Sequence, residues 1–153
     1  MSEDHAAVIA RPPLIYLTSI ASAIALDLLW PLGFAPASLR WALGPVLVMA
    51  SLGLLFLAMR EFRRAGTSVP TYEPTTAIAA TGPYRFSRNP IYLAFTLLQC
   101  GLAVWLDNLW LALVLVPTLA LVSRGVIDRE ERYLERKFGE DYVAYRNSVR
   151  RWI

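Results

Sequence analysis

Four long apolar stretches alternate with polar segments along the 153-residue chain. Hydrophobic residues dominate 14–34 and 39–59, and each stretch is close to the ~20 residues that a helix needs to cross about 30 Å of hydrocarbon. Two further stretches, 91–106 and 109–126, are separated only by Asp107 and Asn108, which predicts a tight helical hairpin. Both are slightly short, so we expect extension or tilt. The pattern predicts an all-α integral membrane protein with a bundle of four transmembrane helices and a cytoplasmic C-terminal helical tail.

The charged and aromatic residues predict the orientation of this bundle. Arg40 is the only basic residue near the loops that follow the first and third spans. The opposite side carries the basic tail and Arg60, Arg63, Arg64, Arg85 and Arg88. Cytoplasmic loops are enriched in arginine and lysine, so we expect that side and both termini to be cytoplasmic. An interfacial aromatic belt is expected at the other side, where four helix ends carry Trp30, Trp41, Trp105 and Trp110.

The composition agrees with a membrane protein of one domain, residues 1–153. Hydrophobic residues make up 56% of the chain, and the mean hydropathy is +0.43. The net charge of +3 follows the predicted topology and lacks the basic, aromatic surface of a nucleic-acid-binding protein. Cys100 is the only cysteine and lies in an apolar stretch, which excludes an internal disulfide and a cysteine-rich metal cluster. His5, the only histidine, lies in the acidic head of the chain, where a catalytic role is not expected.

Two polar segments are long enough to carry chemistry, 67–92 and 127–152. The first begins with TSVPTYEPTT, where Pro70 and Pro74 argue against a continuous helix. In the second, apolar residues recur on one helical face, and Gly139 predicts a turn between two shorter helices. One interpretation of this tail is an amphipathic helix whose arginines contact lipid headgroups.

Opposite charges flank the predicted hairpin. Glu130 and Glu131 follow the fourth span, and Arg85 and Arg88 precede the third. Paired acids gain nothing from an anionic leaflet, so they need another explanation. They form ion pairs that close the bundle, or they clamp a zwitterion together with the arginines. In the second case, Tyr84 and Tyr92 supply ring faces for a cation or an adenine.

Several familiar sites are missing from the sequence. It contains no GxGxxG fingerprint, no P-loop and no zinc-ligand spacing, and a Ser/His/Asp triad has no suitable histidine. Chemistry in this chain therefore has to rest on positioning a cosubstrate that is already activated.

GPYRFSRNPIY and EERYLERKFGEDYVAYR, on either side of the hairpin, resemble the C-terminal half of the isoprenylcysteine carboxyl methyltransferase and phospholipid methyltransferase superfamily. The resemblance covers about residues 68–152 and is greatest to the small bacterial members of the inner membrane. It implies an S-adenosylmethionine site at the cytoplasmic face and a lipophilic or small methyl acceptor, with membrane lipids as partners and with no metal and no nucleic acid.

The resemblance also implies roles for particular residues. The cofactor-binding set would be Thr76, Ala77, Ile78, Ala79, Tyr84, Asn89, Pro90, Ile91, Tyr92 and Glu130. The residues that would close the site or contact the methyl acceptor are Arg85, Arg88 and Glu131. The chain departs from the prenylcysteine enzymes in having Asn89 in place of histidine, and Val126 in place of a substrate-binding arginine. Arg124 or Arg129 is a candidate replacement for that arginine.

The function expected from the sequence is S-adenosylmethionine-dependent methyl transfer in the membrane. Two alternatives stay open. Membrane sterol reductases share a related C-terminal architecture and use NADPH, but they are much longer chains. A non-catalytic four-helix membrane protein also fits the hydropathy pattern.

Overall fold

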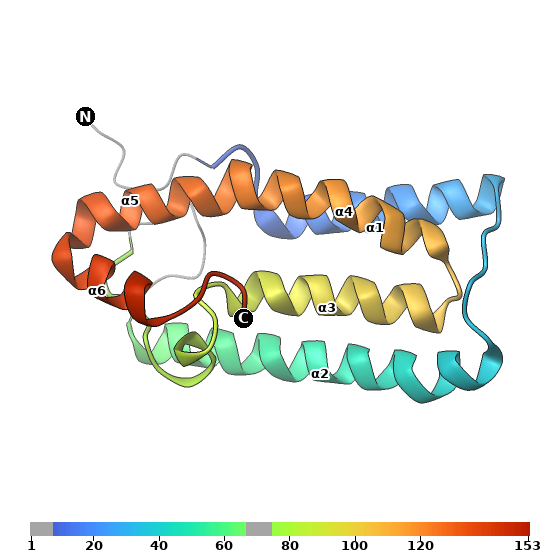
Figure 1. Ribbon diagram of the computed structural model, residues 1–153, viewed down its shortest axis with the longest axis horizontal. Coiled ribbons are helices and arrows are strands. Elements are labelled where there is room, and N and C mark those ends of the chain that lie inside the picture. Colours follow the sequence, from blue (N-terminus) through green and yellow to red (C-terminus); the bar gives the residue numbers. More distant parts are fainter. Residues whose placement is uncertain (1–7, 67–74) are drawn as a thin grey trace.

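The computed structural model describes residues 8–66 and 75–153, and within these ranges the regular structure is entirely helical. His5 and the first part of the 67–92 segment lie outside the described residues. Four long helices run alongside one another (Figure 1): α1 (Pro12–Leu29), α2 (Ala37–Arg64), α3 (Pro90–Trp105) and α4 (Leu109–Val122). A 3-10 helix, η1 (Gly82–Arg85), precedes α3. A π-helical turn, η2 (Ser123–Ile127), joins α4 to α5 (Asp128–Phe138), and α6 (Glu140–Ser148) follows.

Three of these helices are long and apolar enough to cross a membrane: α1, α2 and the continuous helix Leu109–Phe138. The remaining apolar helix, α3, has 16 residues and is about 24 Å long at 1.5 Å per residue. Large apolar side chains point away from the bundle, such as Met49, which is 67% exposed, and Phe56, which is 66% exposed. Such a surface is suited to lipid, and the protein is an integral membrane protein with the all-helical fold that the sequence predicts.

The first helix ends earlier than its hydropathy predicts. Apolar residues continue to Phe34, but α1 stops at Leu29 and the chain beyond it is held by the hairpin. The backbone N–H groups of Phe34 and Ala35 donate to Oδ1 of Asp107 at 2.6 and 2.7 Å. Asp107 itself has φ 55°, the left-handed conformation of a tight turn. Hydropathy predicted that residues 30–34 are apolar, but it could not predict that their backbone leaves the helix to bond with the hairpin.

The four tryptophans gather at the end of the bundle that carries the hairpin. Nε1 of Trp110 donates to the carbonyl oxygen of Trp30 at 2.8 Å, and the rings of Trp41 and Trp105 pack edge to face with centroids 6.4 Å apart. Figure 1 shows the α1–α2 connection at this same end, with α5 and α6 at the other. The predicted separation of an aromatic end from a charged end is therefore present in the fold.

Small residues bring α2 and α3 into close contact. Gly44, Ser51 and Ala58, spaced seven residues apart on α2, are all buried. On the facing helix, a Cβ added to Gly101 would lie 2.9 Å from the backbone nitrogen of Val48. Small residues at such an interface let two membrane helices approach to backbone contact, so α2 and α3 form one tightly packed pair.

A buried polar cluster ties α1 to α3 and α4. The side-chain amide nitrogen of Gln99, which is fully buried, donates to Oγ of Ser19 at 2.8 Å and to the carbonyl oxygen of Leu111 at 3.0 Å. Thr118 adds a hydroxyl contact to Ser19 at 2.9 Å. These bonds satisfy polar groups that would otherwise be stranded in an apolar interior.

Candidate functional site

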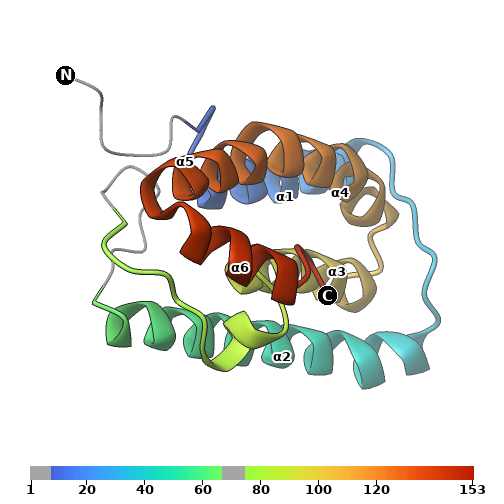
Figure 2. The same cartoon turned by 60° about the vertical axis from the view of Figure 1, so that its left-hand side comes forward.

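A cavity of about 550 Å³ opens at the charged end of the bundle, within the size range of small-molecule sites. Its walls come from the beginning of α1, the second half of α2, the segment before η1, the beginning of α3, and both tail helices. Figure 2 shows these elements converging at that end. The two polar segments that the sequence singled out thus meet around one space.

Most of the predicted site residues line this cavity: Ala77, Ile78, Ala79, Tyr84, Arg88, Asn89, Pro90, Ile91, Tyr92, Glu130 and Glu131. Thr76 and Arg85 do not. Both are exposed, and the Thr76 hydroxyl donates to the carbonyl oxygen of Gly66 at 2.8 Å. Arg124 and Arg129, the candidate substitutes for the family's arginine, are also exposed and outside the wall, whereas Arg11 from the N-terminal side is part of it.

Glu130 presents the cavity with an acidic group. Apart from Arg124, the helix Leu109–Phe138 carries its charged residues from Asp128 onward, and Glu130 lies in this charged part, beyond the predicted span 109–126. The hydroxyl of Tyr92 donates to its Oε1 at 2.7 Å. Although the residue still contacts the cavity, the surrounding protein removes enough water to raise the pKa of Glu130 to about 7, and neighbouring Glu131 adds to the rise against the opposing Tyr92 bond.

Five tyrosines make the cavity wall aromatic: Tyr84, Tyr92, Tyr133, Tyr142 and Tyr145. Tyr84 is 4% exposed and packs edge to face on Phe62, with ring centroids 5.1 Å apart. Its hydroxyl has no hydrogen-bond partner among the described residues, and burial raises its pKa above the usual range. A buried hydroxyl without a partner at a cavity wall is a group that a ligand or a water molecule can satisfy.

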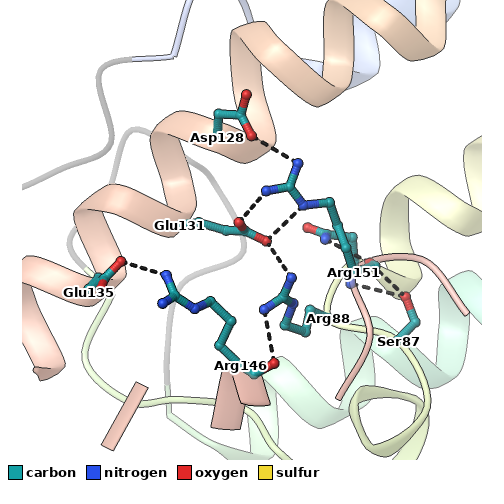
Figure 3. A network of polar contacts seen from close by, with 8 residues as sticks. Ser87, Arg88, Asp128, Glu131, Glu135, Arg146 and Arg151 are labelled. Carbon is teal, nitrogen blue, oxygen red and sulfur yellow. Dashed lines mark hydrogen bonds and ion pairs between the residues drawn. The ribbon is translucent and has the colours of Figure 1, made fainter. Parts of the chain in front are cut away.

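Glu131 has a different environment from Glu130. Its carboxylate pairs with Arg88 at 3.1 Å and with Arg151 at 2.5 Å (Figure 3). Arg88 also donates to the carbonyl oxygen of Arg146 at 3.2 Å. Two guanidinium groups therefore balance the charge of Glu131. Of the ion pairs that the sequence suggested, the one between Arg88 and Glu131 is present, whereas Glu130 accepts from Tyr92 and Arg85 is exposed.

The local backbone explains how these side chains reach the cavity. Pro90 occupies the first turn of α3, where its missing N–H leaves no intrahelical bond unmade. Neighbouring residues of η1 face opposite ways, so Tyr84 is buried while Arg85 is exposed. The π-helical turn η2 lies just before Glu130, and such turns are frequent at functional sites because they shift the register of the side chains that follow.

Sequence reasoning missed part of the wall. Arg11 and Leu14 come from the beginning of α1, and Leu55 and Met59 from α2. No local motif marks these residues, because they join the cavity only when distant helices pack. Among the described residues, no group of three or more His, Cys, Asp or Glu side chains is arranged to hold a metal ion.

Comparison with known proteins relates the chain to membrane methyltransferases. Residues 39–141 match the family described as phospholipid methyltransferase. An uncharacterized protein of Haemophilus influenzae is 37% identical over 65 residues, which is 41% of this chain and all of that protein. The nickel-cobalt-cadmium resistance protein NccN of Alcaligenes xylosoxydans xylosoxydans is 32% identical over 97 residues, 62% of this chain but only 41% of NccN. No solved structure matches.

Proposed function

Because the chain belongs to the phospholipid methyltransferase family, we propose that it is an S-adenosylmethionine-dependent methyltransferase of the membrane that acts on a lipophilic or small acceptor. One observation carries this proposal: the two motif segments enclose a single cavity with an acidic group and tyrosine rings in its wall. An ammonium group suits a carboxylate, and a sulfonium or an adenine suits tyrosine faces.

The residues present fit the cofactor. Of the two carboxylates at the cavity, Glu131 is paired with arginines, whereas Glu130 has no ion pair with an arginine among the described residues and accepts from Tyr92. We therefore assign Glu130 to the methionine ammonium. The unpartnered hydroxyl of Tyr84 is a donor for the ribose or the adenine. Residues 77–79 border the same space and offer backbone groups. Asn89 contributes hydrogen bonding and shape but no proton near neutral pH.

When bound, S-adenosylmethionine supplies a methyl group that is already activated as a sulfonium. The chain would then align the acceptor and exclude water, which competes for the methyl group. The Arg88–Glu131 pair and the tyrosines form part of the wall around this space. In this proposal the protein acts through positioning and charge.

The wall of the cavity formed by α1 and α2 is apolar, and it has one arginine at its end. We assign this wall to the acceptor. Leu14, Leu55 and Met59 line it, and Leu14 is 53% exposed, which brings this wall to the outer surface of the bundle. Arg11 lies one helical turn before Leu14, in the same wall. We assign Arg11 to an anionic or polar headgroup and the apolar wall to the attached hydrocarbon, in place of Arg124 and Arg129.

The topology follows from the same arrangement. We propose a single domain with four transmembrane helices, α3 completing the bundle despite its length, in a bacterial inner membrane. The arginine-rich end, with the cavity, the tail and both termini, would face the cytoplasm.

Calorimetric titration of the detergent-purified protein with S-adenosylhomocysteine and with NADPH tests the proposed reaction. We expect heat with the first ligand only. Heat with NADPH alone would indicate a reductase, and no heat with either would indicate a non-catalytic protein. Glu130→Gln should weaken binding of S-adenosylhomocysteine, and Glu140→Gln is its matched control, because it removes the same charge from an exposed residue outside the cavity. Transfer of labelled methyl into a lipid extract identifies the acceptor.

A further inference from the structure

The last residues of the chain are fastened to the segment that begins α3. Residues 149–152, here called the C-terminal strap, follow α6 without regular secondary structure. The backbone N–H of Arg88 donates to the carbonyl oxygen of Arg150 at 2.9 Å. The side-chain amide of Asn89 donates to the carbonyl oxygen of Arg151 at 3.0 Å. The strap thus holds two cavity-lining residues by their backbone and side-chain polar groups.

The side chain of Arg151 reaches the opposite wall of the cavity. Its Nε and Nη2 donate to the two carboxylate oxygens of Glu131 at 3.2 and 2.5 Å, and its Nη1 pairs with Asp128 at 2.9 Å (Figure 3). All three guanidinium nitrogens are therefore engaged by α5. Such a two-pronged contact fixes orientation as well as distance, which an ammonium group cannot do.

We propose that Arg151 is a positioning residue that sets the register between the two walls of the cofactor cavity. Its carbonyl oxygen holds Asn89 and its guanidinium holds Glu131, so one residue joins the beginning of α3 to α5. Arg151 does not line the cavity and acts only through residues that do. The effect on ligand binding rests on the proposed function, whereas the coupling between the walls does not.

The contacts of Glu131 explain why Arg88 alone does not hold this carboxylate in place. Arg88 approaches Glu131 through one nitrogen, at 3.1 Å, and its Nε has no hydrogen-bond partner among the described residues. The side chain of Glu131 is 11% exposed, so loss of Arg151 leaves its carboxylate with Arg88 as its single ion-pair partner in a largely buried position. We expect Glu131 and Arg88 to shift together, which would displace the wall next to Glu130.

Ligand binding provides the first test. Arg151→Gln should weaken S-adenosylhomocysteine binding about tenfold or more, and Arg151→Lys should recover part of the loss. Arg150→Gln is the matched control, because its side chain is exposed and the same charge is removed one residue away. In a Glu131→Gln background, Arg151→Gln should change the affinity less than it does in the unmodified protein, since the charged pairing with Glu131 is already lost and only that with Asp128 remains. Unaltered affinity in Arg151→Gln, or an undiminished effect in that background, would overturn the proposal.

Hydrogen–deuterium exchange provides a second test that needs no ligand. Arg151→Gln should accelerate exchange of the Arg88 amide, and Arg150→Gln should leave it protected, while the amides of α2 keep their rates in both variants. Equal protection of Arg88 in Arg151→Gln and the unmodified protein would refute the coupling. Absence of S-adenosylhomocysteine binding to the unmodified protein would instead refute the proposed function, and exchange would still decide the role of Arg151.

Discussion

Replacing Glu130 by glutamine should lower the affinity for the cofactor and remove the part of its pH dependence that belongs to this carboxyl. Glutamine keeps the size of the side chain and an oxygen that can accept from Tyr92. A hydrogen bond to a charged group contributes about 1.5–3 kcal/mol, so we expect affinity for S-adenosylhomocysteine to fall by roughly 10- to 150-fold. Calorimetry at pH 8 measures this loss directly.

The pH dependence follows from the position of the Glu130 carboxyl. Its pKa is raised to about 7, so the ligand-free protein carries the protonated form below that pH and the carboxylate above it. A ligand cation requires the carboxylate, and binding therefore weakens as the pH falls. With one proton at stake, the ionised fraction is about tenfold smaller at pH 6 than at pH 8. Affinity should drop by the same factor.

The glutamine variant also corrects for titration of the ligand itself. Any pH dependence that belongs to S-adenosylhomocysteine or to the buffer remains in Glu130→Gln and can be subtracted. The reasoning is refuted if the variant binds within about twofold of the unmodified protein at pH 8, or if the two proteins have the same pH profile. Equal melting temperatures and elution volumes establish that both proteins are folded.

Three further substitutions test the fold and the acceptor side. Gly101→Ala should destabilise the protein by about 1–3 kcal/mol because the new Cβ meets α2, whereas Gly53→Ala, with open space around it, should be neutral or slightly stabilising; detergent melting temperatures compare them. Asp107→Asn should be milder than Asp107→Ala in the same assay, because asparagine keeps an acceptor oxygen and tolerates φ 55°, and equal losses would contradict this. Arg11→Gln should raise the KM for an anionic lipid acceptor with no change in S-adenosylhomocysteine affinity, and the exposed Arg63→Gln should alter neither.

The sequence predicted the helices well where hydropathy and hydrogen bonding coincide. The 91–106 stretch became α3 within one residue at each end, because Pro90 begins the helix and the hairpin turn ends it. The predicted span 39–59 is shorter than α2, because the helix continues to Arg64 through polar residues that a hydropathy pattern leaves out. The end of α1 was missed because it depends on Asp107, more than 70 residues away along the chain.

The site was predictable as far as its motifs extend. Tyr84, Asn89 and Glu130 lie at the cavity because short motifs fix their local geometry. Arg85 was included as part of the same motif, although the 3-10 turn directs it to solvent. Arg151 reaches Glu131 only because the tail folds back, and the spacing of the two residues along the chain does not predict that contact.

The close packing of α2 against α3 limits how the cavity can admit a lipid. Those two helices touch at backbone distance through Gly101, so a lipid has no room between them at that level. The α1 helix packs on α4 and is joined to α3 through side-chain hydrogen bonds such as that between Ser19 and Gln99. We therefore expect an acceptor to enter between α1 and α2, where Leu14, Leu55 and Met59 already bring the apolar wall of the cavity to the outer surface of the bundle.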